Sequence, residues 1–242
     1  MENSAPIDRI SNLPDDSRHW RSGYFNVNSL IEIVKRHPVE NLRIVSSVAP
    51  FSQSIFILPT LVVLKLDKLK LVVKDVTLSV QDFKAKLITA DVDAFDVPFT
   101  VLSNVKILKL EMMKYRFPGI NYTGFSVFRN LTNLQLYIFD FPHWDYIVEV
   151  LQFCPKLQIF YLIKWEINKN LSINWKYPKL VPECISFELK SCTIVYEGRE
   201  NDIRFTKYIL QNARILEVMK ITIHHHLTLQ EISHFVTAKS PQ

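Results

Sequence analysis

One short hydrophobic motif recurs along this chain of 242 residues. Its apolar positions follow the spacing L-x-x-L-x-L, so the last two apolar residues are separated by a single position. Spacing of this kind places both side chains on the same face of a β-strand, and the residue between them on the opposite face. Six short strands with one buried face each are therefore predicted. The copies are Val39-x-x-Leu42-x-Ile44, Leu61-x-x-Leu64-x-Leu66, Val105-x-x-Leu108-x-Leu110, Leu131-x-x-Leu134-x-Leu136, Leu157-x-x-Phe160-x-Leu162 and Leu189-x-x-Cys192-x-Ile194.

The distances between the copies predict a repeat architecture. The starts are 22, 44, 26, 26 and 32 residues apart, and 44 is twice 22. Leucine-rich repeats have periods of roughly 20–29 residues and contribute one parallel strand per repeat. The 44-residue step contains no clean copy, but residues 72–97 alternate loosely, so a degenerate repeat is expected there. The predicted fold class is α/β, a ribonuclease-inhibitor-like leucine-rich-repeat solenoid with irregular repeats.

Two segments with helical periodicity precede strands. Residues 30–38 align without gaps with residues 147–155, and both segments end in a proline. The proline favours an extended conformation for the residue before it, and so ends each helix. We expect both helices to pack behind the strands, on the convex side of the solenoid. The apolar stripe of the second has the spacing i, i+3, i+4, i+7 and comprises Trp144, Ile147, Val148, Leu151 and Cys154.

The pattern changes after Leu162. Trp165, Trp175 and two proline-containing pairs, Tyr177-Pro178 and Val181-Pro182, indicate an irregular connection. The two tryptophans have two interpretations. They can act as binding anchors at the rim of the repeats, or they can pack the junction between the repeats and the segment that follows.

A strand–helix–strand unit is predicted at the C-terminal end. Glu197-Gly198 marks a turn, and Asn201 and Asp202 supply helix-capping side chains. We expect the unit to close the solenoid, because an open sheet edge invites pairing with other chains. Its elements are a strand over residues 186–196, a helix to about Ala213, and a strand over residues 215–223 with Ile215, Met219, Ile221 and Ile223 on one side and Leu216, Val218 and Lys220 on the other.

Composition excludes several classes of function. The net charge is +5, but the 29 Lys and Arg residues are scattered among acids and apolar residues, which is not the footprint of a nucleic-acid-binding surface. Three cysteines without paired spacing argue against a disulfide scaffold and fit a reducing compartment. No run of 18 apolar residues predicts a membrane span, and residues 1–14 lack the apolar core of a secretory signal. Cytoplasm or nucleus is the expected location.

Candidate chemistry is sparse. His224-His225-His226 is the one metal-like cluster, but strand neighbours point to opposite faces, so a solvated strand end is the preferred interpretation. Asp91-Val92-Asp93 lacks the glycine and distal glutamate of a calcium loop, and we interpret it as an exposed polar edge. No nucleophile motif, phosphate-binding loop or zinc motif is present. We therefore expect no cofactor, no metal and no enzymatic activity.

The C-terminal unit resembles the FBD domain of plant F-box proteins that also carry leucine-rich repeats. The most specific piece is the helix ending Lys207-Tyr208-Ile209-Leu210-Gln211-Asn212-Ala213-Arg214 before a short strand. The resemblance extends over nearly the whole chain. Its other matching residues are Asn26 to Ser29, Cys154 to Leu157, Trp175, Pro178, Val181 to Cys184, Leu189 to Ile194 and Tyr196 to Gly198.

The N-terminus resembles only the opening of an F-box, the motif that binds the Skp-type adaptor of an SCF ubiquitin ligase. The resemblance covers Asp8 to Asp16 and implies adaptor contacts for Ile10, Leu13 and Pro14, but the F-box helices that normally follow are missing. The expected domains are an F-box remnant and linker over residues 1–25, a repeat region over 26–170 and an FBD-like domain over 171–242.

The resemblance implies a substrate receptor that holds an unidentified protein for ubiquitin-dependent degradation, with a Skp-type adaptor as second partner. The alternative is an interaction-only or decoy protein, or a truncated gene product, that no longer docks on the ligase.

Overall fold

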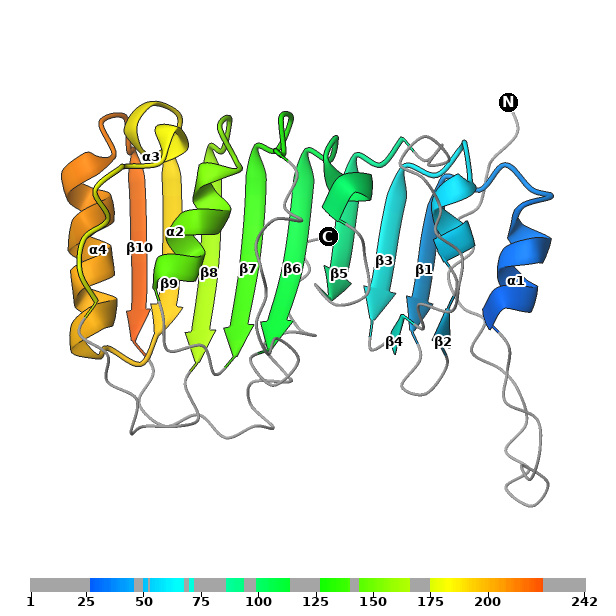
Figure 1. Cartoon of the computed structure of the whole chain (residues 1–242), viewed down its shortest axis with the longest axis horizontal. Helices are drawn as coiled ribbons and strands as arrows, with labels where there is room; N and C mark the ends of the chain where they lie inside the picture. The colour runs from blue at the N-terminus through cyan, green and yellow to red at the C-terminus, as the bar shows by residue number, and fades with distance from the viewer. Residues whose placement is uncertain are drawn as a thin grey trace, which may run out of the picture.

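Eight strands form one parallel sheet, and their order across the sheet is their order along the chain (Figure 1). This computed structural model describes residues 27–45, 50–51, 53–67, 70–71, 86–93, 99–113, 127–139, 144–165 and 175–223. Two short strands, β2 (Pro50–Phe51) and β4 (Lys70–Leu71), pair with each other in a separate two-stranded sheet. The strands of the main sheet are β1 (Asn41–Val45), β3 (Val63–Asp67), β5 (Thr89–Asp93), β6 (Ile107–Met113), β7 (Asn133–Phe139), β8 (Ile159–Trp165), β9 (Ser191–Tyr196) and β10 (Val218–Ile223).

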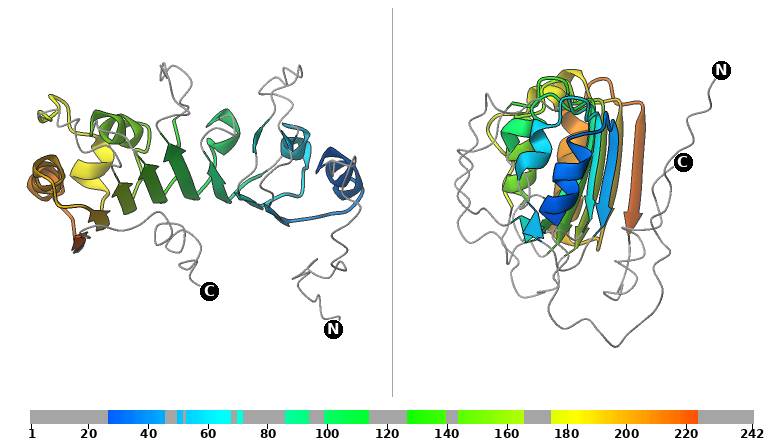
Figure 2. Two further views of the ribbon diagram at one scale, coloured as in Figure 1. Left: turned by 90° about the horizontal axis from the view of Figure 1, so that it is seen from below. Right: turned by 90° about the vertical axis from the view of Figure 1, so that its right-hand side faces the viewer.

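The helices lie along one face of this sheet (Figure 2). The sheet bends gently, and the helices are on the outer side of the bend. The helices predicted before Pro38 and Pro155 are confirmed as α1 and α2. The helical elements are α1 (Val27–Val34), η1 (Gln53–Ile57), η3 (Phe99–Leu102), α2 (Asp145–Gln152), α3 (Glu183–Phe187) and α4 (Glu200–Asn212).

A chain of backbone hydrogen bonds shows that the described residues contain eight copies of the motif rather than six. The residue after the first apolar position of each copy donates its N–H to the same position of the preceding copy, as in Thr132 to Lys106 and Gln158 to Thr132, both 3.0 Å. Ile88 and Glu217 take part in this chain with the same geometry. The two additional copies are Leu87-x-x-Ala90-x-Val92 and Leu216-x-x-Met219-x-Ile221.

The copy at Leu87 confirms the degenerate repeat predicted within residues 72–97. It divides the 44 residues into steps of 26 and 18. Alanine replaces the central leucine at Ala90, and for this reason the sequence pattern did not show the copy. Ala90 nevertheless pairs with Leu64 on one side and with Leu108 on the other. The alternating residues 76–80 lie outside the described residues.

The inward-facing residues of the strands form one hydrophobic core with the helices. Leu64, Leu108 and Leu134 share one row and are at most 1% exposed. Burying a leucine fully contributes roughly 1.5–3 kcal/mol, so rows of such residues supply the main stabilisation of the sheet. From the helical side, α2 contributes Ile147, Val148, Val150 and Leu151, and the segment after it contributes Cys154.

The C-terminal elements begin later than predicted. Residues 183–187 form α3, so the strand expected from residue 186 begins at Ser191. The last strand begins at Val218 because residues 214–215 form a turn. That turn breaks the predicted alternation, so Leu216 packs against the core beside Met219 while Ile215 is 41% exposed.

The strand–helix–strand unit extends the sheet and does not close it. β9 and β10 continue the parallel order, and β10 is the last strand of the sheet. Within the described residues the predicted closure is therefore wrong, because the unit adds two strands of the same kind and leaves a new edge.

The turn at Glu197-Gly198 is confirmed and gives a stability prediction. Gly198 has a φ of +83°, and a Cβ there would lie 2.9 Å from Cγ2 of Ile223. We expect Gly198→Ala to lower the free energy of unfolding by about 1–3 kcal/mol, because the backbone conformation and the contact are both unfavourable. Urea denaturation followed by circular dichroism measures the loss. An unchanged midpoint would contradict this expectation.

Candidate binding surface

The face of the sheet opposite the helices carries a continuous row of side chains. The position between the last two apolar residues of each motif points to this face, because side chains alternate along a strand. Strand pairing then aligns these positions across the sheet. We call this the central row: Arg43, Lys65, Asp91, Lys109, Gln135, Tyr161, Thr193 and Lys220.

Charged residues occupy the N-terminal half of the central row. Arg43 is exposed, and Lys65, Asp91 and Lys109 are partly exposed. The Lys109 Nζ lies 3.2 Å from Oδ2 of Asp91 on the neighbouring strand. A partly exposed ion pair of this kind contributes about 1 kcal/mol or less to stability. Its main effect is to fix the position of the Lys109 ammonium.

The C-terminal half of the same face is aromatic. Five side chains that are 3–8% exposed form a hydrophobic cluster there, and the partly buried Tyr161 packs against it. The rings of Tyr137 and Tyr161 lie 6.1 Å apart between their centroids. We call this the aromatic cluster: Tyr137, Phe139, Ile163, Trp165 and Val195.

Lys109 connects the charged half to the aromatic cluster. Its Nζ lies 5.2 Å from the centroid of the Tyr137 ring, within the range of a cation–π interaction. Burial raises the pKa of Tyr137 to about 12, with smaller contributions from the nearby Tyr161, Asp91 and Glu111. Burial also raises the pKa of Tyr161. Both phenols therefore stay neutral at physiological pH and can donate as well as accept hydrogen bonds.

The described side chains offer little for metal binding or nucleophilic chemistry. Within the described ranges, no group of three or more His, Cys, Asp or Glu side chains is placed to hold a metal ion. All three cysteines are buried and free, and burial is the main cause that raises the thiol pKa of Cys184 and Cys192 to about 12. Thiols in such surroundings are poor nucleophiles. Nor does any helix in the described part of the chain have the length and apolar character to span a membrane.

Trp175 packs a junction between α2 and α4. Its indole Nε1–H donates to Oδ1 of Asp145, and its backbone N–H donates to Oδ1 of Asn201, each at 3.0 Å. Its ring is 4% exposed and lies 5.7 Å from the ring of Tyr208 and 5.8 Å from that of Phe205, between centroids. Of the two interpretations of Trp175, junction packing is confirmed.

Trp165 has a different place from the predicted one. It is the last residue of β8, not part of an irregular connection, and it belongs to the aromatic cluster. Its side chain is 3% exposed, so it is a buried member of the candidate surface rather than a rim residue.

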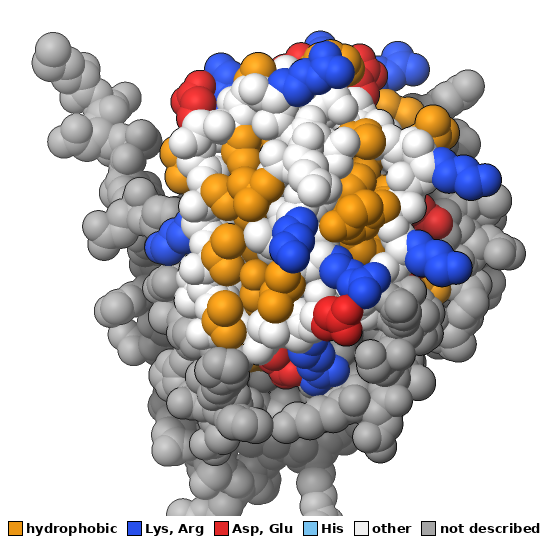
Figure 3. Space-filling model, turned by 90° about the vertical axis from the view of Figure 1, so that its left-hand side faces the viewer, with side chains coloured by type: hydrophobic (Ala, Val, Ile, Leu, Met, Phe, Trp, Pro, Cys, Tyr) orange, Lys and Arg blue, Asp and Glu red, His pale blue; other side chains and the backbone are white. Residues whose placement is uncertain are grey.

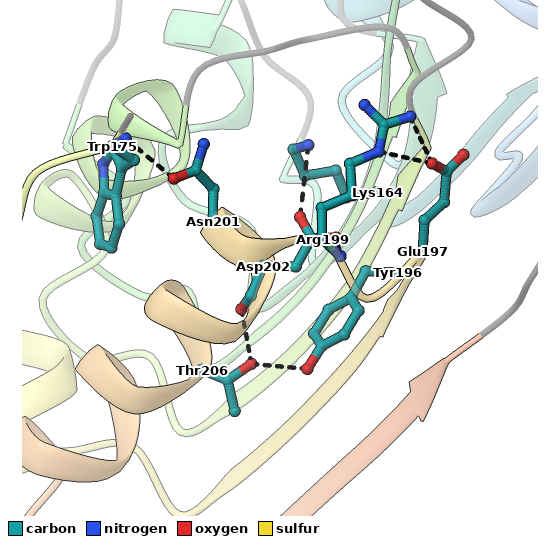
Figure 4. Close-up of polar contacts among 8 residues, drawn as sticks. All are labelled: Lys164, Trp175, Tyr196, Glu197, Arg199, Asn201, Asp202 and Thr206. Carbon is teal, nitrogen blue, oxygen red and sulfur yellow. Dashed lines mark hydrogen bonds and ion pairs between the residues drawn. The ribbon is translucent and has the colours of Figure 1, made fainter. Parts of the chain in front are cut away.

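A buried ion pair lies in the same junction (Figure 4). The Lys164 Nζ lies 3.8 Å from Oδ1 of Asp202, and each residue is 3% exposed. The same Nζ lies 5.1 Å from the centroid of the Trp144 ring. Next to the pair, Thr206 Oγ1 donates to the backbone carbonyl of Asp202 at 3.0 Å, and its oxygen lies 3.1 Å from the hydroxyl of Tyr196.

Asp202 also caps α4, although not as predicted. Arg199 occupies the N-cap position of the helix. Asp202 lies in the first turn, and its Oδ2 accepts the backbone N–H of Arg199 at 2.9 Å. Asn201 does not cap the helix, because its side-chain oxygen accepts the N–H of Trp175.

Comparisons with known proteins now identify the relatives. The FBD family matches residues 177–221, which include α3, β9, α4 and most of β10. An F-box/FBD/LRR-repeat protein of Arabidopsis thaliana is 34% identical over 123 residues, covering 48% of this chain and 26% of the relative. About half of the chain is similar to plant F-box/FBD/LRR-repeat proteins.

Further F-box/FBD/LRR-repeat proteins of Arabidopsis thaliana match at similar levels. One is 35% identical over 102 residues, covering 40% of this chain and 24% of the relative. Another is 31% identical over 141 residues, covering 55% of this chain and 29% of the relative. The matches thus span about a quarter of the length of these F-box/FBD/LRR-repeat proteins. No solved structure matches the chain significantly.

Helix α4 belongs both to the FBD match and to the junction. Phe205, Tyr208 and Asp202 lie within the matched residues, whereas Trp144 and Lys164 come from the repeats before it. The Trp144 and Phe205 rings stack with centroids 4.2 Å apart. The FBD helix is thus held against the repeats by aromatic stacking and by a buried ion pair.

The remaining predicted site residues have mixed outcomes. Ile10, Leu13, Pro14 and the histidines 224–226 lie outside the described residues, so those predictions stay predictions. Asp91 lies in β5, between β3 and β6, so the polar edge expected at residues 91–93 is wrong. The central row itself could have been predicted from the residue between the last two apolar positions of each motif.

Proposed function

We propose that this chain is a protein-interaction module that holds a protein partner on the helix-free face of its sheet, as the substrate-binding part of an F-box-type ubiquitin-ligase receptor. The observation that carries the proposal is the central row, in which Lys109, Gln135, Tyr161 and Thr193 are aligned and partly exposed next to the aromatic cluster. Tyrosine is among the residue types that dominate the energetics of protein interfaces, and a lysine charge adds electrostatic complementarity to an acidic partner. The similarity to F-box/FBD/LRR-repeat proteins supports the same class of function.

We further propose that the sheet and helices form a leucine-rich-repeat solenoid over residues 26–170, followed by an FBD-like domain over residues 171–242. The hydrogen-bond chain that links one position in all eight copies supports the repeat interpretation. The role of residues 1–25 as an F-box remnant, with Ile10, Leu13 and Pro14 as adaptor contacts, is part of the proposal. The proposed role requires no cofactor, nucleic acid or membrane, and no enzymatic activity.

Two variants of the central row test the proposed surface. We expect Tyr161→Ala and Lys109→Glu each to reduce recovery of a specific protein from plant extract by about tenfold, which corresponds to a loss of about 1.4 kcal/mol in binding free energy. The matched control is Lys207→Glu, because Lys207 is exposed on α4, on the other face of the molecule. Quantitative mass spectrometry of the captured proteins gives the comparison. Equal recovery by all four proteins would rule out this face as the binding site.

Binding to a Skp-type adaptor separates the two versions of the function. A receptor that docks on the ligase binds the purified adaptor, as an intact F-box relative does under the same conditions, and Leu13→Ala with Pro14→Ala weakens that binding. A chain that fails to bind while the relative succeeds is an interaction-only protein. Adaptor binding does not depend on the central row, so the two experiments can fail independently.

A further inference from the structure

The last strand, β10, leaves one edge of the sheet unpaired within the described residues. The Val218 N–H donates to the Lys190 carbonyl at 3.0 Å, toward β9. Backbone groups alternate in direction along a strand, so those of Met219, Ile221 and Ile223 point away from the sheet. Within the described residues, three of the six residues of β10 thus present backbone donors and acceptors in the direction of a further strand.

Hydrophobic side chains are exposed around this edge. In β10, Val218, Ile221 and Ile223 are 52%, 43% and 49% exposed, and on α4 Ile203 and Leu210 are also exposed. Figure 3 shows this end of the molecule, where hydrophobic side chains gather in two groups separated by basic ones. Edge strands of monomers are usually protected by several charges, prolines or bulges, whereas Lys220 is the single charged residue of β10.

The sequence of β10 fits pairing with a second copy of itself. A two-fold axis makes the two strands antiparallel and places one residue opposite its own copy. An axis at Lys220 would oppose two ammonium groups. An axis at Ile221 instead places Ile221 opposite Ile221, Met219 opposite Ile223 and Lys220 opposite Thr222, so each apolar residue on the helix side meets an apolar residue.

The backbone directions select the same axis. The N–H and C=O groups of Met219, Ile221 and Ile223 point outward. In this register, Ile221 and its own copy exchange two hydrogen bonds, and so does each pair of Met219 with Ile223 of the other copy. The two-fold also keeps both copies of α4 on one face of the joined sheet and orients them antiparallel. Ile203 and Leu210 lie seven positions apart on the exposed side of α4. In antiparallel helices, Ile203 of one copy can therefore meet Leu210 of the other.

We propose that two copies of this chain form a homodimer by antiparallel pairing of β10 about a two-fold axis at Ile221. The interface joins the two parallel sheets into one and covers the exposed end of each. It leaves the central row of both copies open, so the dimer presents two partner-binding faces side by side.

Ile221→Pro tests the pairing directly. Proline removes an N–H that points outward, and prolines are tolerated on edge strands at such positions, so the β9–β10 ladder stays intact. We expect analytical ultracentrifugation to show a dimer for the natural chain and a dissociation constant at least about tenfold weaker for the variant. The matched control is Val45→Pro in β1, the opposite edge strand, where Val45 is 56% exposed.

A cysteine variant tests the register. Ile221→Cys places two thiols opposite each other, with Cα atoms about 5.5 Å apart, within the range that a disulfide spans. The natural cysteines are buried, so a covalent dimer formed under mild oxidation reports this contact, and Val45→Cys should form none. A natural chain that stays monomeric at all concentrations would overturn the proposal. So would a dimer that Ile221→Pro leaves unchanged, or one in which Ile221→Cys does not cross-link.

Discussion

Trp175→Ala is expected to lower the free energy of unfolding by about 3–5 kcal/mol, the usual cost of deleting a buried tryptophan. The side chain is 4% exposed and packs against the rings of Phe205 and Tyr208. Its removal leaves a cavity between α2 and α4 and an unpaired carboxylate at Asp145. Urea denaturation, monitored by circular dichroism, measures the change.

Two further variants separate the contributions at Trp175. Trp175→Phe keeps an aromatic ring but loses the hydrogen bond to Asp145, so a cost of about 1–2 kcal/mol is expected. Leu180→Ala is the control in the same segment, because Leu180 is 76% exposed and should change stability by less than about 0.5 kcal/mol. If Trp175→Ala reduced partner binding but not stability, the tryptophan would be a binding anchor and not a junction residue.

Much of this architecture could be predicted from the sequence, because leucines at fixed spacing are buried wherever the repeats stack. The two copies at Leu87 and Leu216 show where the hydrophobic pattern alone does not identify a repeat. At Ala90 a small residue fills an inward position that leucine occupies elsewhere, and only the strand pairing with Leu64 and Leu108 identifies it. At Leu216, a turn of two residues shifted the alternation that was predicted from residue 215 onward.

The polar part of the junction could not be predicted for a different reason. Lys164 follows Leu162 by two positions, so a continued strand alternation places it on the inward face, where a lysine is unexpected. Its partner Asp202 lies 38 positions later, at the start of a helix, where an acidic residue is usual. Nothing local in either segment indicates that the two side chains meet, since the contact depends on how α4 packs over β8.

Breaking the Lys164–Asp202 pair from either side should cost about 3–5 kcal/mol, because the remaining charge is left buried without its counterion. Lys164→Met retains a long side chain over the Trp144 ring but removes the ammonium. Asp202→Asn removes the charge but keeps an oxygen that can accept the Arg199 N–H. The pair thus allows the ionic interaction to be removed without loss of packing or of the helix cap.

The double variant Lys164→Met/Asp202→Asn distinguishes an ionic pair from two independent contributions. Because neither charge is then buried alone, its loss of stability should be smaller than the sum of the single losses by at least about 1–3 kcal/mol. Hydrogen exchange should locate the effect, with amides of α4 losing protection in the single variants while those of β6 and β7 keep it. This contrast is expected because the ion pair ties α4, which lies in the FBD match, to β8 of the repeats. Additive losses, or equal loss of protection in all three elements, would show that the pair does not couple the FBD helix to the sheet.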